Sequence, residues 1–131
     1  MMLEENRIAR EIVDGAFKVH TTLGPGLLES VYERALTHEL TQRGLSVACQ
    51  VPIPVAYDDV MLEVGFRADM VVNDTVIVEL KSVEKLDRVH YKQTLTYVRI
   101  AGKRLGLLIN FGSEYIKDGI HRIANRLPDD G

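Results

Sequence analysis

Arg67-Ala-Asp-Met-Val-Val-Asn-Asp-Thr-Val-Ile-Val-Glu-Leu-Lys81 is the stretch that decides the fold. It predicts two short apolar strands joined near Asn73-Asp74, a dipeptide that tolerates the backbone of a tight turn. Asp69 lies in the first strand, and Glu79 and Lys81 lie in the second. Ionised side chains are costly to bury unless they are paired or hold a metal. These charges therefore predict a functional site inside an apolar hairpin, with a structural salt bridge as the alternative.

The length of the loop decides whether the two carboxylates can meet. Side chains alternate between the faces of a strand, so Glu79 and Lys81 share a face. Asp69 lies directly opposite Glu79 only if the loop has an odd number of residues, such as Asn73-Asp74-Thr75. A two-residue turn would direct Asp69 to the opposite face. A site at the hairpin therefore predicts an odd loop or a β-bulge.

Two neighbouring carboxylates are a poor arrangement without a cation and a good one for Mg²⁺. This ion prefers hard oxygen ligands and keeps several waters and a substrate phosphate. A bound cation polarises a phosphoryl oxygen and eases the ionisation of water, while Lys81 can orient that water or offset developing charge. Without a metal, Lys81 would bridge Asp69 or Glu79, and the spacing alone leaves both interpretations open.

Length and composition are those of one globular domain spanning residues 1–131, with 46% hydrophobic and 27% charged residues. The apolar runs are too short to span a bilayer, and the N-terminus lacks the pattern of a secretory signal. The single cysteine, Cys49, excludes an internal disulfide and a clustered-cysteine metal site. We therefore expect a cytoplasmic protein that does not associate with membranes.

Charge is distributed unevenly along the chain, although the net charge is only −3. Residues 1–80 carry 6 Lys/Arg and 13 Asp/Glu, whereas residues 81–104 carry 7 Lys/Arg and 2 Asp/Glu. The basic run, which includes Lys85 and Arg88, follows directly on the charged hairpin. It predicts either an electrostatic footprint for a phosphate backbone beside an acidic site or the solvated face of a helix.

Hydrophobic periodicity predicts an α/β layer architecture. We expect helices over residues 4–22, 27–43 and 88–101, and strands over residues 45–57, 61–72, 75–83 and 104–110. The segment 115–123 is ambiguous between a short strand and a helical turn. Residues 127–131 are expected to form a frayed tail.

Several motifs resemble a known family. Asp69 followed by Glu79-Leu-Lys81 resembles the catalytic signature of the PD-(D/E)XK nuclease superfamily, with Ala68 in place of the signature's proline. Upstream, Gly26-Leu-Leu-Glu29-Ser-Val-Tyr32 matches the motif of the GxxExxY protein family, a branch of that superfamily. The segments 19–32, 90–97 and 106–112 resemble that family as well, so the resemblance spans nearly the whole chain.

The resemblance implies a restriction-endonuclease-like fold, with a central four-stranded mixed sheet flanked by helices. It also implies that Asp69, Glu79 and the backbone carbonyl of Leu80 are ligands of Mg²⁺ or Mn²⁺, and that Lys81 holds the attacking water. Glu29 would be the acidic residue of an early helix that reaches the metal directly or through water. The alternative for Glu29 is a surface acid at a helix N-terminus, where the helix dipole favours it.

Three residues of the helix after the hairpin, His90, Gln93 and Tyr97, share one face. Gln93 and Tyr97 resemble the QxxxY pattern of several nucleases of the superfamily, which implies a role near the metal site or on the nucleic-acid backbone. The alternative is a polar seam packed on the sheet. Tyr32 is expected to face the core with its hydroxyl near the site.

The leading hypothesis is a metal-dependent nuclease, a hydrolase that cleaves phosphodiester bonds of nucleic acid, DNA rather than RNA, with activated water. The alternative is a catalytically silent nucleic-acid-binding or assembly module that keeps the fold. The intact set of Asp69, Glu79 and Lys81 favours the enzyme. Because the chain is small and acidic, a homodimer or a partner is one way in which it could engage its substrate.

Overall fold

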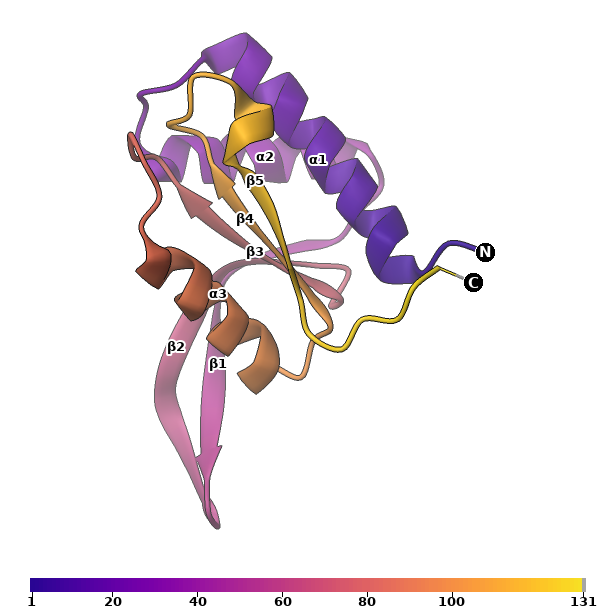
Figure 1. Cartoon of the computed structure of the whole chain (residues 1–131), viewed down its shortest axis with the longest axis vertical. Helices are drawn as coiled ribbons and strands as arrows, with labels where there is room; N and C mark the ends of the chain where they lie inside the picture. Colours follow the sequence, from indigo (N-terminus) through magenta and orange to yellow (C-terminus); the bar gives the residue numbers. More distant parts are fainter. Residues whose placement is uncertain (131) are drawn as a thin grey trace.

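A five-stranded mixed sheet lies at the centre of the molecule (Figure 1). The computed structural model describes residues 1–130, apart from the side chain of Val64. The strands follow one another across the sheet as β1 (Val47–Tyr57), β2 (Val60–Val72), β3 (Val76–Lys81), β4 (Leu105–Asn110) and β5 (Ile120–Ala124). Neighbouring strands are antiparallel except for β3 and β4, which are parallel and are joined through a helix.

Three α-helices cover the sheet, with α1 (Glu4–Leu23) and α2 (Glu29–Gln42) on one face and α3 (Arg88–Ile100) on the other (Figure 1). The larger core cluster lies under α1 and α2, and includes Ile8, Ile12, Leu36, Met70, Val78 and Leu107. The smaller cluster lies under α3 and consists of Ala68, Val71, Ile77 and Val98. Every residue of β4 is buried, as expected for a strand covered on both faces. The α/β architecture predicted from periodicity is confirmed.

The predicted four-stranded sheet has a fifth strand. The ambiguous segment 115–123 contains both alternatives in succession, a 3₁₀ helix η1 (Ile116–Gly119) and then β5, which pairs antiparallel with β4. With only five residues, β5 is too short for its alternation to be visible beside the preceding helical turn. None of the helices within residues 1–130 is long and apolar enough to cross a membrane.

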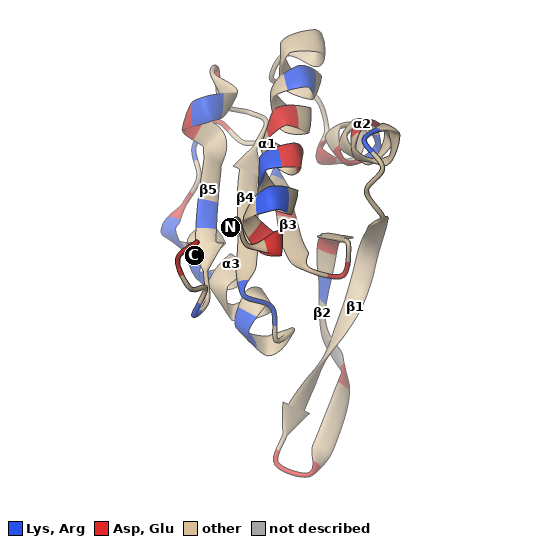
Figure 2. Ribbon diagram, turned by 90° about the vertical axis from the view of Figure 1, so that its right-hand side faces the viewer, with Lys and Arg blue, Asp and Glu red and all other residues tan. Residues whose placement is uncertain are grey.

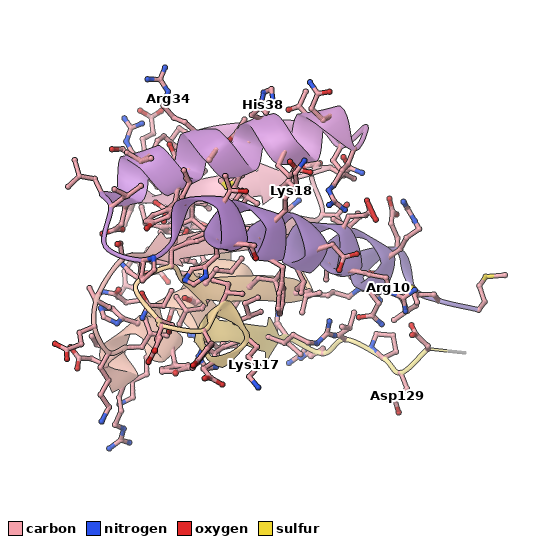
Figure 3. All side chains as sticks on the ribbon, turned by 90° about the horizontal axis from the view of Figure 1, so that it is seen from above. Arg10, Lys18, Arg34, His38, Lys117 and Asp129 are labelled. Carbon is pink, nitrogen blue, oxygen red and sulfur yellow. The ribbon has the colours of Figure 1, made fainter. Side chains whose placement is uncertain are left out.

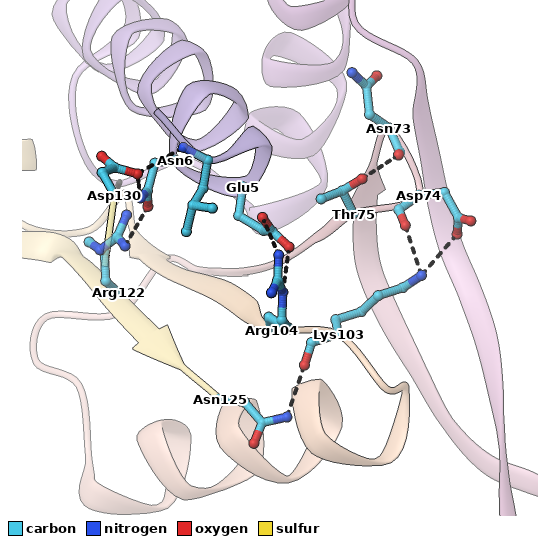
Figure 4. A network of polar contacts seen from close by, with 11 residues as sticks. Glu5, Asn6, Asn73, Asp74, Thr75, Lys103, Arg104, Arg122, Asn125 and Asp130 are labelled. Atoms are coloured by element: carbon cyan, nitrogen blue, oxygen red, sulfur yellow. Dashed lines mark hydrogen bonds and ion pairs between the residues drawn. The ribbon is translucent and has the colours of Figure 1, made fainter. Parts of the chain in front are cut away.

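The C-terminal tail is attached to the start of α1, so the frayed tail expected over residues 127–131 is wrong for residues 127–130. Leu127 packs against the larger core cluster. The Asp130 carboxylate accepts hydrogen bonds from the Leu3 amide at 2.8 Å and from Asn6 Nδ2 at 2.7 Å (Figure 4). Gly131 lies outside the described residues.

Tyr32 fixes the loop that leads into α2. Its ring is fully buried and stacks on Phe111 with centroids 4.5 Å apart. Its hydroxyl donates to the Gly24 carbonyl and accepts from the Leu27 amide. From the other side, the Ser82 hydroxyl donates to the Leu27 carbonyl. The loop is thereby held against the chain that follows β3, and α2 begins beside it at Glu29.

We expect Tyr32→Phe to lower the free energy of unfolding by about 0.5–1.5 kcal/mol, because the Leu27 amide and the Gly24 carbonyl lose their shared, part-buried partner. Urea unfolding followed by circular dichroism measures the change. Tyr115→Phe is the matched control, since Tyr115 is 61% exposed. Equal stabilities of the two variants would contradict the assigned role of the hydroxyl.

Candidate active site

The hairpin loop has the odd length that a site requires. Strands β2 and β3 are paired through Met70↔Val78, Val71↔Ile77 and Val72↔Val76, which leaves a loop of residues 73–75. Asn73 and Asp74 in this loop have φ values of 50° and 52°, a backbone that Asn and Asp adopt more readily than other residues with a side chain. Extending the register by one residue places Asp69 opposite Glu79, as the parity argument predicted.

Beyond the last residue pair of the β2–β3 ladder, two side-chain carboxylates accept the hydrogen bonds of the backbone amides. The Asp69 amide donates to Glu79 Oε2 at 2.8 Å, and the Leu80 amide donates to Asp69 Oδ2 at 2.8 Å. The N–H and C=O groups of a strand residue point to the same side, so the Leu80 carbonyl also points into the gap left by β2. Both carboxylates and this carbonyl thus belong to the stretch where the two strands separate.

Glu79 carries the most strongly perturbed carboxyl of the site. Its side chain is only 6% exposed. Its pKa is raised to about 8, mainly by burial and then by the negative charges of Asp69 and Glu29, against the opposing effects of the Asp69 amide and Lys81. The effect of Glu29, the exposed first residue of α2, places this carboxylate within electrostatic reach of the pair. The site therefore holds more negative than positive charge.

Lys81 lies on the same face as Glu79 and is half-buried. Within residues 1–130, no direct ion pair joins its ammonium to either carboxylate. Its charge lowers the pKa of Glu79 from a longer distance. The structural salt bridge considered as the alternative is therefore not formed, and the ammonium keeps its hydrogen-bond donors available.

The alternation of side chains reverses at Asp69 and at Gln50, the residue facing it on β1. Val47 and Met70 pack with the larger core cluster. Val51 and Ala68, which lie an even number of residues away along the same strands, pack with the smaller cluster on the other face. Residues two apart share a face in a regular strand. Because of this reversal, the Asp69 side chain belongs to neither core cluster, and its carboxylate points into the gap beside β3.

Gln50 is a site residue that sequence reasoning missed. Its side-chain nitrogen donates to Glu33 Oε1 of α2 at 2.7 Å and to Asp69 Oδ1 at 3.4 Å. Glu33 is half-buried whereas Glu29 is exposed, so the expectation from helical periodicity that Glu33 lies further toward solvent is wrong. Glu33 is connected to Asp69 through the one amide of Gln50. No local pattern marks Gln50, because its partners depend on how β1 pairs with β2 and packs under α2.

Tyr97 of α3 borders the carboxylates from the side of β2. Its ring stacks on Phe66 with centroids 3.9 Å apart. Burial raises the pKa of its hydroxyl, and the charges of Glu79 and Asp69 raise it further. Gln93, one turn earlier, is exposed. His90 is engaged in the helix cap, because its Nδ1 accepts a hydrogen bond from the Asp87 amide at 3.1 Å.

The basic run of residues 81–104 does not form one surface beside the carboxylates. At 100° per residue, Arg88, Lys92 and Arg99 fall within about 40° of one another on α3, whereas Tyr97 lies about 180° from Arg88. Two further cations have acidic partners, since Lys103 pairs with Asp74 and Arg104 pairs with Glu5 (Figure 4). Lys and Arg are accordingly scattered over several elements (Figure 2).

Lys85 lies in the loop before α3. It lines a cavity of about 190 Å³ together with Tyr91 and His121. The Tyr91 hydroxyl and His121 Nε2 are 3.3 Å apart there. Lys85 and Arg88 thus both lie toward the start of α3.

The donor set at the end of the hairpin fits a hard divalent cation that keeps part of its water. Among residues 1–130, no three His, Cys, Asp or Glu side chains form a group that could hold a metal by themselves. The available ligands are Asp69, Glu79 and the Leu80 carbonyl. One or two carboxylates completed by water and phosphate oxygens are the usual environment of Mg²⁺, so the residues present fit such an ion.

Comparison with known proteins gives one positive result. A family model described as the PD-(D/E)XK nuclease superfamily matches residues 6–123. The searches against curated proteins and against solved structures give no match. The matched region contains all three α-helices except the first two residues of α1, and nearly all of the sheet. With this match, the mixed sheet flanked by helices agrees with the restriction-endonuclease-like fold class.

We expect Glu79→Gln to change how stability depends on pH in the presence of EDTA. The folded state holds the Glu79 proton more tightly than the unfolded state, because the pKa is raised from 4.5 to about 8. The resulting stabilisation is complete below pH 4.5 and is lost as the pH rises to about 8. Between these values, wild type should lose up to about 1.4 kcal/mol per pH unit relative to the variant.

Urea unfolding at several pH values between 5 and 8 measures this difference. Glu63→Gln is the matched control because Glu63 is exposed, and its stability should follow that of wild type. A constant difference between wild type and Glu79→Gln over this range would show that Glu79 is ionised throughout.

Proposed function

The chain belongs to the PD-(D/E)XK nuclease superfamily, since the family model covers residues 6–123 of its 131, and on that premise we propose that it is a divalent-metal-dependent nuclease. It hydrolyses phosphodiester bonds, with DNA as the preferred substrate. The observation that carries the proposal is the Asp69–Glu79 pair at the separation of β2 and β3, in which Glu79 is buried. Such a pair costs stability, and strongly perturbed carboxyls of this kind concentrate at functional sites.

Asp69, Glu79 and the Leu80 carbonyl would hold the ion, and Glu29 would reach it directly or through water. When bound, the ion supplies Lewis-acid polarisation of the phosphoryl oxygen and lowers the pKa of water. Without a cation Glu79 is largely protonated at neutral pH, since its pKa is about 8. The negative charges of Asp69 and Glu29 still outnumber the one positive charge of Lys81, so the site would repel a phosphate. This imbalance supports a requirement for metal.

Lys81 holds the water that attacks phosphorus. It shares a face with Glu79 and has no direct ion pair within residues 1–130, so its N–H donors remain free to orient a water oxygen. Its positive charge also offsets the negative charge that develops on the phosphoryl oxygens in the transition state.

Substrate contacts extend from the site around α3. Tyr97 lies beside the carboxylates and Gln93 is exposed on the same side, where both can contact the sugar-phosphate backbone. Lys85 and Arg88 contact phosphates further along the strand. His90 and Tyr32 have structural roles: His90 caps the N-terminus of α3, and the Tyr32 hydroxyl holds the loop before α2. Membership of the GxxExxY branch and a homodimer stay predictions, the second to be decided by sedimentation.

We expect purified protein to nick or degrade plasmid or single-stranded DNA with Mg²⁺ or Mn²⁺ and to be inactive in EDTA. Asp69→Asn, Glu79→Gln and Lys81→Ala should each lose roughly a hundredfold to ten-thousandfold in kcat, because each removes a group that acts on the water or the phosphate. Lys18→Ala is the control, since Lys18 pairs with Glu39 between α1 and α2 and neither residue belongs to the proposed site.

Wild type that is as inert as these variants on DNA and RNA, while still binding nucleic acid, would favour the silent binding module instead.

We expect Lys85→Ala and Arg88→Ala to weaken DNA binding without regard to sequence. Each should reduce the slope of log K against log salt by about 0.9, the value of one lost phosphate contact on a duplex. Fluorescence anisotropy with a labelled duplex measures the slope, in an Asp69→Asn background that prevents cleavage. The control is Arg10→Ala, since Arg10 lies on α1 (Figure 3). An unchanged slope for both variants would remove these residues from the interface.

A further inference from the structure

Gln50 has an unusual backbone at the point where the alternation of β1 and β2 reverses. Its φ is 53°, in the left-handed region that residues other than glycine seldom occupy. Cys49↔Met70 and Val51↔Ala68 are paired on either side of it, so Asp69 is the residue opposite. A regular strand would direct the Gln50 and Asp69 side chains to one face. The left-handed residue turns the Gln50 side chain toward both Asp69 and α2.

The contacts of the Gln50 side chain fix its orientation. Its Nε2 donates to Glu33 Oε1 at 2.7 Å and to Asp69 Oδ1 at 3.4 Å. An ionised carboxylate only accepts hydrogen bonds, so the amide nitrogen with its two N–H groups must face both partners. The other oxygen of Asp69 is held by the Leu80 amide at 2.8 Å. One oxygen of Asp69 is therefore held closely by β3, and the other has a longer contact with the exposed Gln50 side chain of β1.

The chemistry of an amide suits this position better than that of a cation. A lysine or arginine between Glu33 and Asp69 would neutralise the charge that a metal ion needs. A neutral amide separates the two carboxylates and orients Asp69, yet leaves its negative charge in place. Glu33 binds the amide with the shorter bond and so anchors it from α2.

We propose that Gln50 is a positioning residue, which orients Asp69 through its side-chain amide with Glu33 as the anchor of that amide. The proposal rests on the proposed function, because its effect on hydrolysis requires Asp69 to take part in the reaction. Gln50 touches neither substrate nor metal; it acts through Asp69.

A purely structural role makes a different prediction. In that case, Gln50 would only connect β1 to α2, and its special backbone would matter more than its amide. Gln50→Gly keeps the left-handed backbone without strain and removes the amide. Gln50→Glu keeps the length of the side chain but replaces the donor with a carboxylate. Both variants therefore test the amide.

The experiment compares kcat and KM for DNA cleavage in wild type, Gln50→Gly, Gln50→Glu and the control Gln42→Ala, which changes an exposed glutamine at the end of α2. We expect both Gln50 variants to lose about 10- to 100-fold in kcat, because small displacements of a catalytic group have effects of this size. KM should change less than about twofold, and the melting temperature of Gln50→Gly should not fall. An unchanged kcat in Gln50→Gly would overturn the proposal.

An exchange of the two side chains distinguishes orientation of Asp69 from attachment of α2. The double variant Glu33→Gln/Gln50→Glu restores an amide–carboxylate bond between α2 and β1 but places a carboxylate against Asp69. We expect it to remain as impaired as Gln50→Glu. Recovery of the wild-type kcat would mean that Gln50 only attaches α2, and would overturn the proposal.

A measurement on the metal-free protein separates failure of this proposal from failure of the proposed function. The side-chain amide protons of Gln50 give their own signals in a ¹⁵N correlation spectrum. These signals should shift in both Glu33→Gln and Asp69→Asn, whether or not the protein cleaves DNA. If wild type is inactive, the nuclease proposal fails, and the amide signals alone then test whether Gln50 orients Asp69. Signals that respond to neither substitution would overturn the positioning role.

Discussion

The separation of β2 from β3 is the constraint on which the rest of the structure depends. The two strands stay paired for only three residue pairs, and the amides of Asp69 and Leu80 then lose their ladder partners. Buried amides need an acceptor, and the carboxylates of Glu79 and Asp69 supply it. The groups that complete the sheet are thus the same groups that form the site. Substitution of either carboxylate affects folding and chemistry together.

Much of this could be predicted from local pattern. Helical periodicity gave the three helices to within a few residues, and the odd loop followed from the demand that Asp69 face Glu79. The residues that pattern could not reveal depend on distant partners. Gln50 contacts Asp69 only because β1 lies beside β2 and under α2. Lys103 and Arg104 form ion pairs with Asp74 and Glu5, which are distant in sequence, so local pattern could not show that these two cations are paired.

Charge is arranged differently from what the linear sequence suggests. The basic run follows the acidic hairpin in sequence, yet on α3 the arginine and lysine face lies opposite Tyr97, which borders the carboxylates. Lys81 is the cation whose charge lowers the pKa of Glu79. Nucleic acid that reaches both surfaces must therefore pass around the helix rather than along one flat basic face.

The hydrogen bonds at the start of α2 show that the conformation of the motif Gly26-Leu-Leu-Glu29-Ser-Val-Tyr32 depends on residues outside it. Gly26 adopts a φ of 102°, Glu29 supplies charge at the first residue of the helix, and Tyr32 buries its ring against Phe111. The tyrosine hydroxyl closes the loop, and Ser82 fastens it from a different part of the chain. These seven residues, grafted into another scaffold, would lack the Phe111 ring and the Ser82 hydroxyl that hold this loop in its conformation. The structure of the motif therefore depends on residues outside the motif itself.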